Sequence, residues 1–138
     1  NDQGLAGHSD ADVLVHAICD ALLGALALGD IGQHFPDTSD EWEGANSLDL
    51  LRRVAGRIAT EGFGVSNIDV TVVLEQPRLE SHTESMRQHL ATAVGIPASR
   101  VSVKATTSER LGFAGREEGI AAHAVCAVFA REESPGNQ

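Results

Sequence analysis

The chain has 138 residues, of which 42% are hydrophobic and 22% are charged, as is usual for one soluble globular domain. The formal net charge of −10 argues against nucleic acid as a partner, because phosphate backbones are bound by clustered Lys and Arg. No apolar run approaches the roughly 20 residues that a membrane-spanning helix needs, so no membrane partner is expected.

The predicted elements run helix, helix, strand, helix, strand, strand. Apolar residues at helical spacing indicate the helices, and runs rich in Val, Ile and Thr indicate the strands. The expected boundaries are a loop over 1–8, a helix over 9–29, a polar loop over 30–46, a helix over 47–62, a strand over 67–75, a helix over 80–95, a strand over 100–106, a loop over 108–119 and a strand over 120–130. A mixed sheet with helices on one face makes a two-layer α/β (α+β) sandwich. We expect residues 1–131 to form one domain and 132–138 to form a C-terminal tail.

Three features bear on the cellular compartment. No signal peptide or transit peptide is recognisable. The chain opens at Asn1 without a Met, so we expect the natural N-terminus to lie upstream. Cys19 and Cys126 lie in apolar runs without metal-ligand spacing, which predicts two buried, reduced thiols. A reducing compartment follows, with a bacterial cytoplasm favoured over a plastid.

The charges are distributed unevenly along the chain. Residues 1–50 hold ten of the twenty acidic residues and none of the ten Lys and Arg, and the first basic residue is Arg52. One interpretation is a solvated acidic face. The other is a region that holds cations, in which metal ions supply the positive charge for a phosphate ligand.

A polar stripe follows one face of the first predicted helix. Asp12, His16 and Asp20 are spaced i, i+4 and i+8, so they share that face. The stripe is either solvated or contains a His metal ligand with acidic neighbours that orient it. His8 precedes the helix, and one His does not make a zinc site, which usually has three or four protein ligands.

Two turn-rich segments are candidates for ligand binding. Gly29 to Thr38 combines glycines, acids and one aromatic residue, which suits a polyol, although a plain connecting loop fits equally well. Lys104 to Glu109, followed by Arg116, places hydroxyls, a carboxylate and a guanidinium where a strand meets a loop. Such groups bind phosphates and a divalent ion, but a cap-rich turn is the alternative, and the Walker spacing is absent.

Four segments in register resemble one family, the 2-C-methyl-D-erythritol 2,4-cyclodiphosphate synthases. They are His-Ser-Asp-x-Asp-x-x-x-His from His8, Asp-Ala-Leu-Leu-Gly-Ala from Asp20, Gly-Asp-Ile-Gly-x-x-Phe-Pro-Asp-Thr from Gly29, and Val-Lys-Ala-Thr-Thr-x-Glu-x-Leu-Gly-Phe-x-Gly-Arg-x-Glu-Gly-Ile-Ala from Val103. The similarity runs from about Gly4 to Ala130, nearly the whole chain.

The resemblance implies a reaction and an assembly. The family cyclises 4-diphosphocytidyl-2-C-methyl-D-erythritol 2-phosphate: the 2-phosphate attacks the β-phosphorus and CMP leaves, in the non-mevalonate route to isoprenoids. A transition metal, usually zinc, binds the β-phosphate, and a second divalent ion, magnesium or manganese, bridges the α- and β-phosphates. The family's enzyme is a homotrimer with active sites between subunits.

The resemblance also implies roles for individual residues. His8 and Thr107 are the catalytic groups that stabilise the transition state. His16 binds zinc, and Glu109 reaches the bridging ion. Substrate contacts are implied for His8 and Ser9, for Asp30, Ile31, Gly32, Phe35, Pro36, Asp37, Thr38 and Ser39, for Leu74, Pro77, Arg78 and Leu79, and for Thr106, Thr107, Ser108, Glu109, Phe113 and Arg116.

The chain departs from the family at its N-terminus. The family's metal site takes an Asp-x-His from an N-terminal strand, and that strand does not precede the helix here. Either the segment belongs to the natural protein and is missing from this chain, or this copy is deficient in metal. Two alternative functions remain: a non-catalytic trimer that binds a nucleotide or an isoprenoid, and the C-terminal half of a bifunctional cytidylyltransferase and cyclase.

Overall fold

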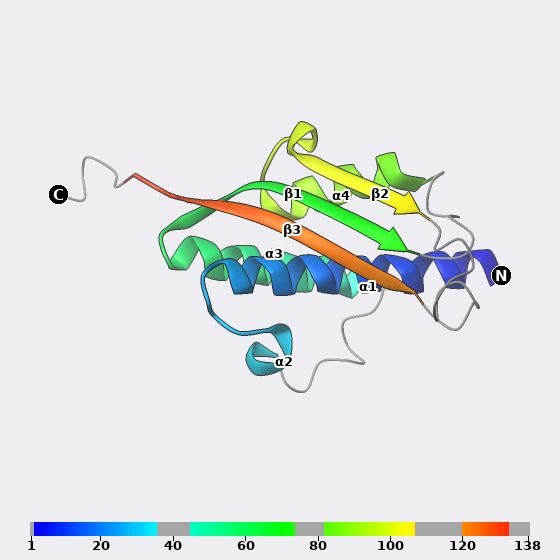
Figure 1. Cartoon of the computed structure of the whole chain (residues 1–138), viewed down its shortest axis with the longest axis horizontal. Coiled ribbons are helices and arrows are strands. Elements are labelled where there is room, and N and C mark those ends of the chain that lie inside the picture. The colour runs from blue at the N-terminus through cyan, green and yellow to red at the C-terminus, as the bar shows by residue number, and fades with distance from the viewer. Residues whose placement is uncertain (1, 36–44, 74–81, 107–119, 133–138) are drawn as a thin grey trace.

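The computed structural model describes residues 2–35, 45–73, 82–106 and 120–132, with side chains from residue 11 onward except at 45 and 46. Helices and strands form two layers (Figure 1). The elements are α1 (Asp2–Ala25), α2 (Ile31–His34), α3 (Ala45–Thr60), β1 (Phe63–Val73), α4 (Thr83–Val94), the 3-10 helix η2 (Ala98–Arg100), β2 (Val101–Thr106) and β3 (Ala121–Ala130).

The three described strands make one mixed sheet in the order β2-β1-β3. The central strand β1 pairs in parallel with β2, so that Val70 lies opposite Val103, and antiparallel with β3, so that Val70 lies opposite Ala124. The parallel pair needs a crossover, and α4 with η2 provides it. The order of elements and the mixed sheet predicted from the sequence are therefore confirmed.

One face of the sheet is covered by α1, α3 and α4, and the core lies between the two layers. Leu14, Ile18 and Leu22 recur every four residues on α1 and are fully buried, as the helical spacing predicts. The buried members of α3, β1 and α4 include Leu50, Leu51, Val54, Ile58, Ile68, Val70, Val72 and Leu90. None of the helices in the described ranges is long and apolar enough to cross a membrane.

The opposite face of the sheet is open in the protomer. Val125 and Phe129 of β3 point to this face and are 70% and 46% exposed. Lys104 of β2 and Asp69 of β1 also lie there, and their charged groups pair at 3.1 Å. Among the described residues, this face therefore combines two exposed large hydrophobic side chains with an ion pair.

Three predicted boundaries are wrong, and one of them is the end of the first helix, which lies at Ala25 and not at Gly29. The loop expected over residues 1–8 is helical from Asp2, so α1 includes that segment. The first strand was expected to begin at residue 67, but β1 begins at Phe63. Gly62 has a φ of 90° and turns the chain after α3, whereas Gly64 lies within β1. A Cβ at Gly64 would approach the Phe129 ring to 2.7 Å, so glycine is required there by close packing.

Candidate active site

His16 lies in the middle of α1 and is partly buried. Its Nε2 atom is buried and has no hydrogen-bond partner. Buried polar atoms are nearly always paired, so a nitrogen in this state fits a metal ligand. In the part of the chain that the structure describes, no three His, Cys, Asp or Glu side chains are grouped so that they could hold a metal ion.

Asp20 lies one helical turn after His16, but the structure does not use it to orient that ring. Its Oδ1 atom accepts a hydrogen bond from the backbone N–H of Ile31, at 2.9 Å. The acidic residue therefore ties α1 to the start of α2. Asp20 was interpreted as an acidic neighbour that orients His16, but the hydrogen-bond partner of Asp20 is the N–H of Ile31.

The predicted polyol loop contains the short helix α2, which was not expected. Asp30 caps this helix, since its Oδ1 accepts from the N–H of Gln33 at 3.0 Å. The N–H of Phe35 closes the turn on the carbonyl of Ile31 at 2.7 Å. The structure thus brings together the predicted contacts Asp30, Ile31, Gly32 and Phe35 in one hydrogen-bonded turn.

Two glycines make this turn possible. Gly29 has a φ of 98°, and a Cβ there would lie 1.7 Å from Oε1 of Gln33. At Gly32 a Cβ would lie 3.3 Å from Oδ1 of Asp30, the oxygen that caps the helix. Asp30 and Gly32 are both exposed, so a polar ligand can reach the carboxylate and the backbone beside it.

Thr106 lies at the carboxyl end of β2 and is exposed. Its partner in β1 is Val73, which pairs in turn with Ala121 at the start of β3. Figure 1 shows that the N-terminal end of α1 reaches this same end of the molecule. Two of the predicted binding segments follow Val73 and Thr106 directly in the sequence, and they lie outside the described residues except for Thr106 itself.

The turn around α2 and the Thr106 edge are well separated within one protomer. Figure 1 shows α2 on the far side of α1 and β3 from β2. A single protomer therefore does not bring Asp30 and Thr106 to one site.

The remaining predicted site residues have no described side chains. The backbone of His8 and Ser9 belongs to α1, not to a loop before it. The others lie outside the described residues: Pro36, Asp37, Thr38, Ser39, Leu74, Pro77, Arg78, Leu79, Thr107, Ser108, Glu109, Phe113 and Arg116.

Both cysteines are free, and neither is a candidate nucleophile. Burial is the main cause that raises the pKa of the Cys19 thiol far above its usual range. Burial also raises the pKa of the Cys126 thiol to about 12, although Cys126 is half-buried where full burial was expected. Both groups are therefore neutral thiols near pH 7.

Comparisons with known proteins identify the family. The model described as the YgbB family matches residues 1–129. The chain belongs to the YgbB family. Among its relatives, a protein of Marinobacter nauticus is 58% identical over 94% of this chain and 82% of its own length, and one of Salinibacter ruber is 57% identical over 93% and 82%. Both are named 2-C-methyl-D-erythritol 2,4-cyclodiphosphate synthase, so the resemblance seen in the motifs is confirmed.

Solved structures of YgbB relatives share the fold. The structure described as the bifunctional IspDF from Campylobacter jejuni has a TM-score of 0.79 and 38% identity, with 88% of this chain and 32% of that chain covered. The structure described as IspF of Plasmodium falciparum in complex with CDP has a TM-score of 0.76 and 28% identity, with 87% and 72% covered.

The partner of Asp20 was not predicted from the sequence. The helical spacing from His16 correctly put Asp20 on the same face of α1, but its partner is a backbone N–H eleven residues later. The spacing of Asp30 and Gln33 matches a capping box and is the signal that would have predicted α2.

Proposed function

We propose that the chain cyclises 4-diphosphocytidyl-2-C-methyl-D-erythritol 2-phosphate to 2-C-methyl-D-erythritol 2,4-cyclodiphosphate and releases CMP. The observation that carries this proposal is 53–60% identity to eight proteins that share the name of that synthase. A non-catalytic binding module and a cytidylyltransferase fusion are not favoured by those names.

The chemistry is a displacement at phosphorus within one substrate. An oxygen of the 2-phosphate forms a new bond to the β-phosphorus, and the bond from that phosphorus to the α–β bridging oxygen breaks, so CMP departs with that oxygen. Because both reacting groups belong to one molecule, the protein's main task is to hold it in an in-line arrangement. Such positioning is worth roughly 7–11 kcal/mol in favourable cases.

The α2 turn is suited to the erythritol part of the substrate. The Asp30 carboxylate is exposed and can accept hydrogen bonds from hydroxyl groups, while Oδ1 keeps the turn closed. The exposed edge at Thr106 is suited to the cytidyl diphosphate. The sequence adds His8 and Thr107 as groups that stabilise the transition state, and Phe113 and Arg116 as further contacts.

We assign His16 as one zinc ligand and Glu109 as the contact of a magnesium or manganese ion. The buried, unpaired Nε2 atom of His16 supports the first assignment. Divalent ions at these positions would neutralise the repelling phosphates. Residues 1–50 have no Lys or Arg to do so.

We further propose a homotrimer in which Asp30 of one protomer and Thr106 of the next face the same substrate. The separation of these residues within a protomer supports it, and so does the open sheet face with Val125 and Phe129. The free thiols and the bacterial relatives support a location in the bacterial cytoplasm.

The test is turnover by protein expressed from its complete reading frame. We expect CMP and cyclic diphosphate in equal amounts, followed by phosphorus NMR, with about one zinc per protomer by elemental analysis. If the protein binds CDP but forms no cyclic product with zinc and magnesium added, the catalytic proposal fails, and the binding-module alternative replaces it.

A further inference from the structure

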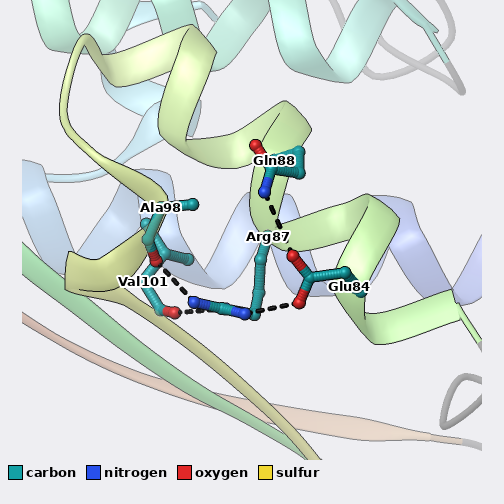
Figure 2. Close-up of polar contacts among 5 residues, drawn as sticks. All are labelled: Glu84, Arg87, Gln88, Ala98 and Val101. Carbon is teal, nitrogen blue, oxygen red and sulfur yellow. Dashed lines mark hydrogen bonds and ion pairs between the residues drawn. The ribbon is translucent and has the colours of Figure 1, made fainter.

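Arg87 of α4 makes a three-way contact that the proposed reaction does not use. Figure 2 shows its guanidinium between two elements. The Nε atom donates to the carbonyl of Val101 at 2.8 Å, Nη2 donates to the carbonyl of Ala98 at 2.8 Å, and Nη1 pairs with the carboxylate of Glu84. The other oxygen of that carboxylate accepts from Gln88 at 3.1 Å.

This contact differs from the other ion pairs on the described helices. The pair of Arg57 and Glu61 joins two exposed residues, one in the last turn of α3 and one directly after it, and contributes little to stability. Arg87 is 30% exposed, and two of its nitrogens donate to backbone carbonyls of β2 and η2. Its third nitrogen, Nη1, pairs with the carboxylate of Glu84 on the same helix. A lysine cannot reproduce this geometry, because its ammonium is a single point of charge.

One of the two carbonyls that Arg87 binds belongs to Ala98 of η2, and the other belongs to Val101, the first residue of β2. This strand has six residues and, in the described sheet, lies at the edge with β1 as its sole neighbour. Its register places Val101 opposite Ile68 and Thr106 opposite Val73. A shift of one residue would turn every side chain of β2, Thr106 included, to the other face of the sheet.

We propose that Arg87 is a positioning residue for nucleotide binding: by fixing the start of β2 on α4, it sets the place of Thr106 at the other end of the strand. The proposal rests on the proposed function, since it assigns the Thr106 edge to the cytidyl diphosphate. The hydrogen bonds of Arg87 go to Glu84, Ala98 and Val101 and involve neither the α2 turn nor α1, which carries His16.

The experiment compares Arg87→Lys with a control of similar stability. CDP affinity is measured by calorimetry, zinc content by elemental analysis and melting temperature by calorimetric scan. Val54→Ala, in the buried face of α3, supplies a destabilised protein with Arg87 intact. Arg57→Lys supplies the same substitution in an exposed pair.

We expect Arg87→Lys to bind CDP roughly tenfold more weakly with its zinc content unchanged, because charge-assisted hydrogen bonds are lost at β2 alone. Both controls should bind CDP as the unmodified protein does. Equal CDP affinity in Arg87→Lys, or an equal loss in Val54→Ala, overturns the positioning role. Failure of the unmodified protein to bind CDP instead overturns the proposed function.

If Arg87→Lys does not fold, the same measurements are made on Arg87→Gln, because the Gln amide can still donate to the carbonyl of Val101 or of Ala98. The expected and contradicting results are the same. The KM for the diphosphocytidyl substrate should rise with the Kd for CDP, which a purely structural role would not produce in a folded variant.

Discussion

The candidate site has two halves, the turn around α2 and the strand β2. Side chains of opposite charge bind the backbone of the two halves. Around α2, the carboxylates of Asp20 and Asp30 accept hydrogen bonds from backbone N–H groups. At β2, the guanidinium of Arg87 donates to backbone carbonyls. The first half lies in a segment without Lys or Arg, whereas all ten basic residues follow residue 50. Under the proposed function, a phosphate beside the first, acidic half needs a bound cation, because residues 1–50 contain no Lys or Arg.

Loss of the metal ligand should break the acidic half most severely. His16→Gln should lower kcat by about 100-fold or more, because the phosphates then lose a neutralising cation. The variant should melt at about the same temperature in the absence of metal, since it replaces one unpaired buried polar group by another. Turnover, bound zinc and the melting temperature of metal-free protein check this. His89→Gln, at an exposed position of α4, is the control and should keep full activity.

Separation of the protomers should disconnect the two halves. Val125→Asp places a carboxylate on the open sheet face, where the position is 70% exposed; its cross-strand partner Asp69 adds some repulsion in a free protomer, which the Lys104 ammonium beside Asp69 reduces. In a trimer covered at this face, the buried charge should shift the protein to monomers and abolish turnover. Light scattering with gel filtration measures the mass. A Val125→Asp protein that remains trimeric and active would show that the interface lies elsewhere.

The Asp20 contact gives a smaller and more local effect. Asp20→Ala removes the acceptor for the Ile31 N–H and should raise the KM of the substrate about tenfold, equivalent to about 1.4 kcal/mol. Asp20→Asn keeps a side-chain oxygen at the same place and should recover most of the affinity. Steady-state kinetics with equal zinc loading separates this role from metal binding. Equal KM values for Asp20→Ala and the unmodified protein would contradict it.

Gly29 tests the stability of the same turn. Gly29→Ala should lower the free energy of unfolding by about 1–3 kcal/mol, because φ is 98° there and the new Cβ meets Gln33. Urea unfolding measures the loss. The double variant Gly29→Ala, Gln33→Ala removes the steric contact and retains the backbone strain, so it should recover part of the loss. Complete recovery would show that strain contributes nothing.

The smallest expected effect concerns pH and the basic half. Hydrogen bonds from Gln88 and then Arg87 hold the pKa of the Glu84 carboxyl below its ordinary value of 4.5. A lowered folded-state pKa adds stability above the unfolded value, and this stability is lost as pH falls through the folded value. Glu84→Gln should therefore melt slightly below the unmodified protein at pH 7, and the difference should vanish in acid. A difference that persists in acid would contradict this cause.

Periodicity predicted the large elements because burial acts on a whole face. The spacing of Leu14, Ile18 and Leu22 is enough to place α1 over the sheet. α2 has four residues, which is too short for periodicity to show, and only its cap at Asp30 marks it. Short helices are therefore predicted from caps and not from hydrophobic spacing.

The candidate site was predicted from the motifs in composition but not in its supporting contacts. The motif residues Asp30, Ile31 and Gly32 do form one turn. Asp20 binds the backbone N–H of Ile31, 11 residues away, and Arg87 binds the backbone carbonyl of Val101, 14 residues away. Every residue has such backbone groups, so these contacts cannot be recognised from the sequence. Such residues become visible when the fold brings their partners within reach.

The protonated state of both cysteines has a practical consequence for labelling. With pKa values raised by burial, Cys19 and Cys126 offer very little thiolate to a maleimide near neutral pH. A new cysteine at an exposed helix position such as Thr92 should therefore react selectively in the otherwise unaltered chain. Fluorophores attached there on separate batches would report subunit exchange by energy transfer.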